Sequence, residues 1–161
     1  MIIISDTSVI TNLIQLEEIE ILKKLFEEII IPPAVNEEIY QIPSQKPIIE
    51  STPWIKTIPV KDKDLFNKLL DQLDKGEAEA IALSVELKAD LLLIDEKKGR
   101  KIATEYGIKI TGLIGILIEA KHAKIINKVK PLLDKLIYEI GFRINPKLYN
   151  RVLSIVDEDK K

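Results

Sequence analysis

Four short, unbroken runs of apolar residues constrain the fold of this chain more than any other sequence feature. They occupy residues 2–4, 29–31, 91–94 and 108–110, and a segment with helical spacing of apolar residues follows each of them. Strands of a parallel sheet have this uninterrupted apolar character because helices cover both faces of the sheet. The sequence therefore predicts a three-layer α/β/α fold with a short central parallel sheet.

The length of 161 residues predicts one domain, because domains commonly contain about 100–200 residues. We expect a single domain over residues 1–156, in which a helical extension at 125–156 packs on the rest, and a frayed tail at 157–161. The extension has an apolar face that includes Val129 and Leu133. Covering the core is the simplest role for this face, and a homodimer interface is the alternative.

Composition excludes several classes of catalytic site. The chain has no cysteine and a single histidine, His122, which excludes Cys-based zinc sites, cysteine nucleophiles and multi-histidine metal sites. A Ser-His-Asp triad is disfavoured for the same reason. Any catalysis must therefore depend mainly on carboxylates, hydroxyls and lysines.

Net charge and hydropathy bear on location and partners. The net charge of −2 neither supports nor excludes nucleic-acid binding. No apolar run approaches the roughly 18–20 residues of a membrane span, and the first residues lack the charged lead of a signal peptide. We therefore expect a cytoplasmic protein that does not contact a membrane.

Two aspartates directly follow predicted strands. Asp6 comes after the run at 2–4, and Asp95 closes the run at 91–94. Parallel α/β sheets bind ligands beyond the carboxyl ends of their strands, so both carboxylates are expected at one edge of the sheet. Each aspartate also precedes a helix and is a good N-cap residue, and the two roles are compatible.

Two predicted helices each direct glutamates toward the protein. On the helix at 33–40, Glu38 lies beside the buried side, whereas Glu37 points away from it. The helix at 76–88 is apolar on two sides, and its narrow polar edges carry Glu77 and Glu79. For Glu38, the alternative is a residue at the boundary of the buried side, with its carboxylate in water. For the helix at 76–88, the alternative is an acid in the first turn that the helix dipole stabilises.

Together these positions predict a cluster of carboxylates from Asp6, Glu38, Glu77 and Asp95. Crowded carboxylates raise one another's pKa values, and a divalent cation relieves their repulsion. A set of oxygen ligands suits Mg²⁺ or Mn²⁺. Such a site can generate hydroxide from bound water and neutralise charge on a phosphodiester, so phosphodiester hydrolysis is the chemistry that the cluster favours.

Six short motifs occur in a fixed order over roughly residues 1–125. They are Ser-Asp-Thr-Ser at 5–8, Ile-Pro-Pro-Ala-Val-Asn-Glu-Glu-Ile at 31–39, Gly-Glu-Ala-Glu-Ala-Ile-Ala-Leu at 76–83, Leu-Leu-Ile-Asp at 92–95, Ile-Thr-Gly-Leu-Ile-Gly at 110–115 and Glu-Ala-Lys at 119–121. Their order resembles that of the PIN-domain proteins, nucleases related to the VapC toxins of toxin–antitoxin pairs. The later motifs look most like a VapC-related prokaryotic branch described as predicted nucleic-acid-binding proteins.

This resemblance implies an endoribonuclease with an acidic Mg²⁺ or Mn²⁺ site. Asp6, Glu38 and Asp95 match the first, second and fourth acids of the family. The third acid is often an aspartate, and here Glu77 stands in its place, with Glu79 as the reserve.

Hydroxyl and basic side chains complete the predicted site. The resemblance implies that three hydroxyls line it, with local capping as the alternative. A basic run after the strand at 91–94 is a candidate for phosphate contacts, with a solvated helix face as the alternative. The hydroxyl residues are Thr7, Ser8 and Thr111, and the basic residues are Lys97, Lys98, Arg100 and Lys101.

Two hypotheses follow for the function. The first is a metal-dependent ribonuclease that uses water as the nucleophile; if it is a toxin, a small separate antitoxin chain would block its acidic site. The second is a PIN-fold module that binds RNA or a partner protein without cleavage. The set of four acids favours the enzyme, whereas the near-neutral charge and the glutamate at 77 favour the binding module.

Overall fold

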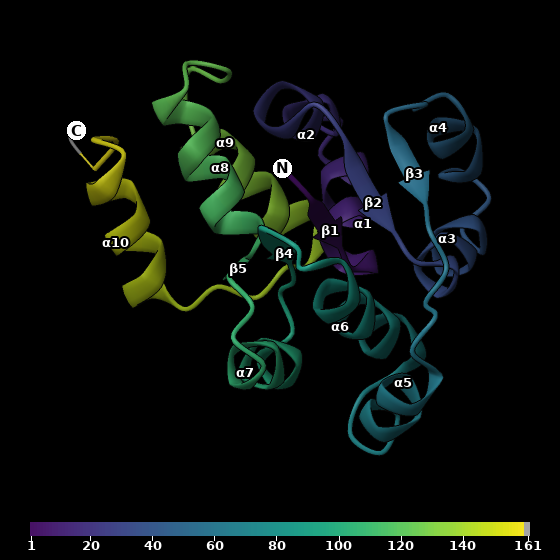
Figure 1. The fold of residues 1–161 in the computed structure, drawn as a ribbon. Coiled ribbons are helices and arrows are strands. Elements are labelled where there is room, and N and C mark those ends of the chain that lie inside the picture. Colours follow the sequence, from purple (N-terminus) through teal and green to yellow (C-terminus); the bar gives the residue numbers. More distant parts are fainter. Residues whose placement is uncertain (160–161) are drawn as a thin grey trace.

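A computed structural model describes residues 1–159, and these form a five-stranded sheet in the order β3-β2-β1-β4-β5 (Figure 1). All neighbouring strands are parallel. The predicted α/β fold with a short parallel sheet is therefore confirmed. The strands are β1 (Ile3–Ser5), β2 (Ile29–Ile31), β3 (Ile55–Thr57), β4 (Leu91–Leu93) and β5 (Ile110–Thr111).

Helices cover both faces of this sheet. They are α1 (Thr7–Gln15), α2 (Glu20–Phe26), α3 (Pro33–Tyr40), α4 (Lys46–Glu50), α5 (Lys63–Leu69), α6 (Lys75–Leu87), α7 (Lys97–Glu105), α8 (Leu113–His122), α9 (Lys130–Lys135), the π-helical η1 (Leu136–Ile140) and α10 (Pro146–Ile155). Successive residues of a strand point to opposite faces: Ile3 packs in a buried cluster with α1 and α8, and Ile4 packs with α6 and α7. Burial on both faces explains why the strand sequences are continuously apolar.

The strands β1 and β4 end side by side at one edge of the sheet. Ser5 pairs with Leu93 in the parallel register, and the backbone N–H of Asp6 donates to the Leu93 carbonyl over 2.9 Å. The chain then enters α1 after β1 and α7 shortly after β4. Asp6 and Asp95 therefore leave the sheet at the same edge.

Two local predictions differ from the structure. The prolines at 43, 47 and 53 predict a loop over residues 41–53, but this segment contains α4, in which Pro47 occupies the first turn and Ile49 is buried. Proline is tolerated there because the first N–H groups of a helix have no intrahelical partner. Within the predicted helical extension, the sequence predicts one helix over residues 127–139. This helix begins later, at Lys130, and continues as η1 up to Gly141, whose φ of +86° ends it.

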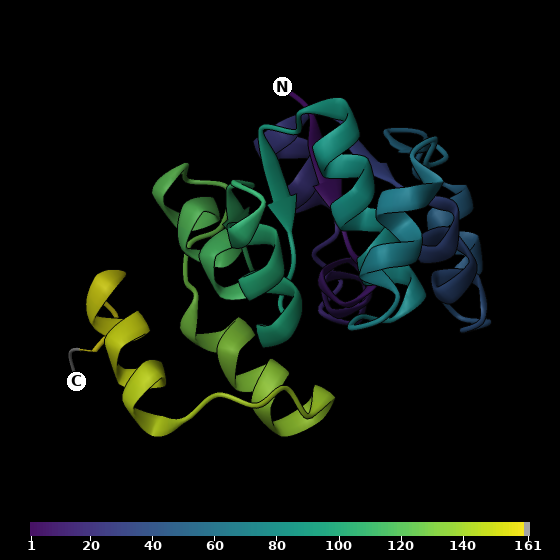
Figure 2. The ribbon, with the colours of Figure 1, turned by 60° about the horizontal axis from the view of Figure 1, so that its bottom comes forward.

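The C-terminal extension packs on the same core as the helices near the N-terminus. An extended segment, 141–145, joins η1 to α10 (Figure 2). Val129, Leu133 and Val152 belong to the buried cluster that also contains residues of α1 and α8. Much of the apolar face predicted for the extension is thus buried within the chain.

The end of the chain is anchored at Glu158. Its carboxylate accepts hydrogen bonds from the N–H groups of Val129 (2.7 Å) and Lys130 (2.9 Å) and pairs with Lys121 Nζ at 2.9 Å. The frayed tail predicted from residue 157 is therefore not found at Glu158, and residues 160–161 lie outside the described residues. No helix within residues 1–159 is both long and apolar enough to cross a membrane.

Candidate active site

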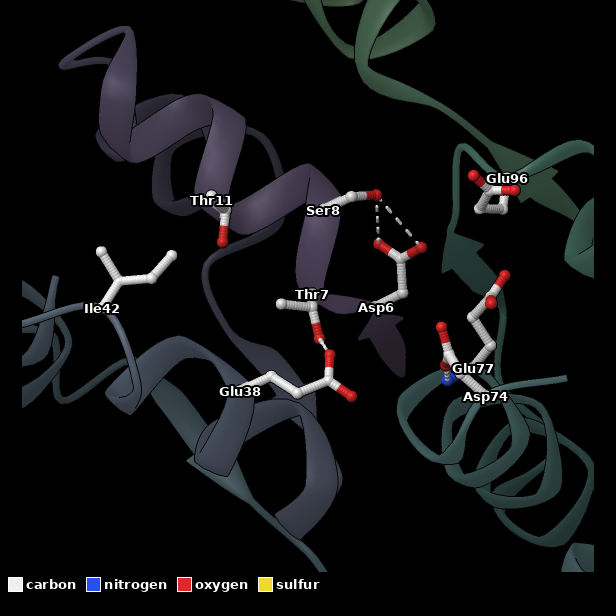
Figure 3. Close-up of a pocket in the computed structure, with 9 residues that line it drawn as sticks. All are labelled: Asp6, Thr7, Ser8, Thr11, Glu38, Ile42, Asp74, Glu77 and Glu96. Carbon is white, nitrogen blue, oxygen red and sulfur yellow. Dashed lines mark hydrogen bonds between the residues drawn. The ribbon is translucent and has the colours of Figure 1, made fainter. Parts of the chain in front are cut away.

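A pocket of about 350 Å³ opens at the carboxyl end of β1, where the first turns of α1 and α6 meet α3 (Figure 3). Carboxylates dominate its lining. In Figure 3, Asp6 lies between Glu38 on one side and Glu77 with Asp74 on the other. The full lining is Asp6, Thr7, Ser8, Thr11, Glu38, Ile42, Asp74, Glu77 and Glu96.

Asp6 is both a helix cap and a pocket residue. Its Oδ1 accepts a hydrogen bond from the N–H of Val9 at 3.2 Å, and the Ser8 hydroxyl lies 3.4 Å from each carboxylate oxygen. Only 3% of the residue is exposed. Burial raises the pKa of Asp6 to about 7, and the charge of Asp95 adds to this rise, whereas the hydrogen bond from Val9 opposes it.

Glu38 reaches the pocket from α3. The Thr7 hydroxyl, in the first turn of α1, donates a hydrogen bond to Glu38 Oε2. Glu38 is half-buried, whereas Glu37 is exposed, as the helical spacing predicts. Thr7 thus holds the carboxylate of Glu38 on the side of α3 that faces Asp6.

Glu77 lies in the first turn of α6, three residues after Asp74, which caps this helix. Asp74 Oδ1 accepts a hydrogen bond from the N–H of Glu77 at 2.9 Å. Burial raises the pKa of Glu77 to about 8, and the side chain and charge of Asp74 and the charge of Asp6 raise it further. Glu77 Oε2 is buried and has no hydrogen-bond partner among the described residues.

Glu79 has a different role from Glu77. It is 7% exposed, and its Oε1 accepts a hydrogen bond from the N–H of Ala34 at 2.9 Å. Ala34 lies in the first turn of α3, where N–H groups lack intrahelical partners. Glu79 therefore connects α6 to α3, and Glu77 is the acid of this helix that lines the pocket.

Asp95 lies beside the pocket rather than in its lining. It faces two adjoining clefts of about 560 Å³ and 470 Å³. Asp95 Oδ1 accepts a hydrogen bond from the N–H of Leu113 at 2.9 Å, in the first turn of α8, while Oδ2 is buried without a partner among residues 1–159. Burial raises the pKa of Asp95, which the Leu113 N–H and the charge of Arg100 counteract.

The donor chemistry of these residues fits a hard divalent cation. Buried polar atoms are normally hydrogen-bonded, yet Glu77 Oε2 and Asp95 Oδ2 are not. All donors are oxygens, as Mg²⁺ and Mn²⁺ prefer. In the described part of the chain, no three Asp, Glu or His side chains already form a group that could hold a metal ion, so binding would require the carboxylates to draw closer.

Nearly the whole chain matches a known family. A family model described as "DUF3368: PIN domain" covers residues 2–158. The chain belongs to this family. PIN domains are generally nucleases and typically use divalent metals. The PIN resemblance of the motifs is therefore confirmed, whereas the VapC-like branch stays a prediction. No curated protein and no solved structure gave a significant match.

Of the five remaining residues predicted for this PIN domain, three line the adjoining clefts, and Lys98 and Lys101 line neither. Thr111, at the end of β5, lines the cleft that contains Asp95 and Arg100. Lys97 lines the other cleft. Lys98 and Lys101 are exposed on α7. The predicted hydroxyls thus divide between the acidic pocket, which has Thr7 and Ser8, and this neighbouring region.

Several residues that line the site region of the PIN domain were not predicted from the sequence, and four of them have side chains that bear on its chemistry. Asp74 and Glu96 line the acidic pocket. The sequence features that could have identified them are the position of Asp74 as the cap residue before α6 and the position of Glu96 directly after Asp95. Phe142 and Arg143 line both adjoining clefts. They belong to segment 141–145, whose sequence has no pattern that would indicate a place beside Asp95.

Proposed function

We propose that this PIN domain is a divalent-metal-dependent endoribonuclease. The observation that carries the proposal is the pocket lined by Asp6, Glu38 and Glu77 at the carboxyl edge of the sheet. The pocket gathers carboxylates and offers only oxygen donors, and its Glu77 Oε2 is buried without a partner among the described residues. These are features that a divalent cation for phosphodiester hydrolysis needs.

Asp6, Glu38 and Glu77 would hold Mg²⁺ or Mn²⁺, with Asp95 contributing from the neighbouring cleft. The bound ion would lower the pKa of a water molecule and neutralise charge on the phosphodiester. Hydrogen bonds from the protein orient three of these carboxylates before they draw together around an ion. Ser8 and the Val9 N–H hold Asp6, the Thr7 hydroxyl holds Glu38, and the Leu113 N–H holds Asp95. Such pre-orientation reduces the reorganisation needed when charge develops on the substrate.

The adjoining clefts provide a surface for the RNA strand. One cleft brings together the side chains of Arg100 and Arg143, and neither guanidinium forms an ion pair among the described residues. Arginine binds phosphate through paired N–H donors. Phe142 lines the same cleft and offers a ring on which a base can stack. A strand bound there would place a neighbouring phosphodiester near Asp95 and the acidic pocket.

The proposal is tested by incubating the purified protein with structured and single-stranded RNAs. Cleavage is expected with Mg²⁺ or Mn²⁺ and is expected to stop when EDTA is added. RNA binding without cleavage under every metal condition, by folded protein free of a copurified partner, would favour the alternative of a silent binding module.

Replacing Arg143 with glutamine is expected to weaken binding of a labelled single-stranded RNA about fivefold and to lower the slope of log K against log salt by about 1. Fluorescence anisotropy with an Asp6→Asn protein separates binding from cleavage. Arg151→Gln is the matched control, because Arg151 is exposed on α10 and does not line either cleft. Equal effects of the two substitutions would contradict the assignment of Arg143.

The motif resemblance supports a finer proposal, that this nuclease is the toxin of a toxin–antitoxin pair. The antitoxin would be a separate chain that covers the acidic pocket and neutralises part of its charge. Addition of such a chain is expected to stop cleavage and to protect Thr11 and Ile42, which line the pocket, from solvent.

A further inference from the structure

Three glycines lie directly against three acidic side chains of the site. A Cβ atom added to Gly76 would lie 2.6 Å from Glu38 Oε1, and one added to Gly99 would lie 2.6 Å from Glu77 Oε2. A Cβ atom added to Gly112 would overlap Asp95 Oδ1. Cβ atoms in proteins essentially never lie closer than 3.0 Å to a non-bonded heavy atom. Each carboxylate therefore occupies the space that a side chain would need.

Backbone conformation does not explain these glycines. Among the glycines of the described residues, positive φ occurs at Gly107 and Gly141, and nothing lies within 4 Å of a Cβ added at either position. Gly76 and Gly99 are in helices α6 and α7, where alanine is intrinsically preferred over glycine. Glycine therefore matters at these positions because it has no side chain, and not because its backbone is flexible.

The three contacts also connect consecutive parts of the site. Gly76 places the start of α6 against Glu38 of α3, and Gly99 places α7 against Glu77 of α6. Gly112, directly before α8, lies against Asp95, two residues after the end of β4. The backbone of a different element thus limits the position of each acid.

We propose that Gly76, Gly99 and Gly112 are positioning residues, each of which leaves the space that one carboxylate needs in order to bind the divalent cation. This inference rests on the proposed function, because it assumes that the carboxylates bind the ion. The glycines themselves touch neither the ion nor the RNA. They act through Glu38, Glu77 and Asp95.

Gly76 offers the cleanest test of the proposal. The three atoms nearest to its added Cβ all belong to the carboxylate group of Glu38, the mobile end of a flexible side chain. At Gly99 the added Cβ would also lie 2.8 Å from Ile94 Cδ1, in the buried core. A methyl group at position 76 should therefore displace a carboxylate and leave the fold intact.

The experiment measures Mn²⁺ affinity by isothermal titration calorimetry and the unfolding temperature by circular dichroism. For Gly76→Ala we expect at least a tenfold loss of Mn²⁺ affinity, with an unfolding temperature equal to or above that of the wild type without metal. Lys75→Ala, in the same turn and exposed, is the control and should retain wild-type affinity. Combining Gly76→Ala with Glu38→Asp, which shortens the acid by one methylene, should recover affinity relative to Gly76→Ala.

The outcomes separate this proposal from the proposed function. Mn²⁺ affinity of Gly76→Ala within twofold of the wild type would overturn the positioning role, even if the wild type cleaves RNA. Loss of affinity in Gly76→Ala with recovery in the double variant would support it, even if no RNA is cleaved. If Gly76→Ala unfolds, Gly112→Ala applies the same test to Asp95. A wild type that binds no Mn²⁺ would overturn both proposals.

Discussion

Replacing Asp6 with asparagine is expected to reduce metal-dependent RNA cleavage by at least about 10³-fold, the scale of losing one member of a catalytic set. Asp6 lies between Glu38 and Glu77 in the pocket, and asparagine cannot supply the negative charge that the cation needs. The helix cap should survive, because the asparagine oxygen can still accept from the Val9 N–H and asparagine caps helices as well as aspartate does. Single-turnover cleavage of a labelled RNA measures the loss.

A second capping aspartate provides the matched control. Asp62 begins α5, and its Oδ1 accepts from the N–H of Leu65 at 3.1 Å in an exposed position. Asp62→Asn makes the same chemical change at the same kind of helix start, outside the pocket, and should retain full cleavage. Comparable activity of Asp6→Asn and Asp62→Asn would contradict the placement of Asp6 at the reacting centre.

Without divalent metal, the protein is expected to lose stability as the pH rises from about 4 to about 8. In the unfolded chain Asp6 loses its proton near its ordinary pKa of 3.8, whereas the folded protein raises that pKa to about 7. Over this interval the unfolded state binds fewer protons, so the free energy of unfolding falls with pH. Asp6 alone accounts for a loss on the order of 4 kcal/mol, and the pKa of about 8 at Glu77 acts in the same direction.

Urea denaturation at pH 4 and pH 8, in EDTA and in Mn²⁺, measures most of this loss. Asp6→Asn removes the ionisable group, so in EDTA at pH 8 it should be more stable than the wild type. Mn²⁺ should stabilise the wild type at pH 8 and have a much smaller effect on the variant. A wild type that is equally stable at both pH values without metal would show that the carboxylates are not destabilised by burial.

The parts of the site that the sequence predicts are those encoded by local patterns. Asp6 and Asp95 directly follow apolar strands, so a parallel sheet brings them to one edge. The spacing within α3 separates Glu38 from Glu37. The fold class follows from the same apolar runs, because a strand buried on both faces has no polar alternation.

The remaining parts depend on contacts between residues distant in the sequence. Glu77 and Glu79 both occupy polar edges of α6, and the approach of Ala34 from α3 decides which of them serves as a cap. Asp95 is held by Leu113, from the start of a helix that follows another strand. Arg143 reaches the clefts through the path of segment 141–145 after η1. No local sequence pattern specifies these long-range contacts.

The contact between Gly99 and Glu77 also constrains how this sequence can change over evolutionary time. A larger residue at position 99 would collide both with the glutamate as it now lies and with Ile94 Cδ1. Replacing the glycine therefore requires a shorter acid at position 77 and a smaller or rearranged side chain at position 94. Lineages that kept glutamate at position 77 should have kept glycine at position 99, and a larger residue at position 99 should occur only where positions 77 and 94 have both changed.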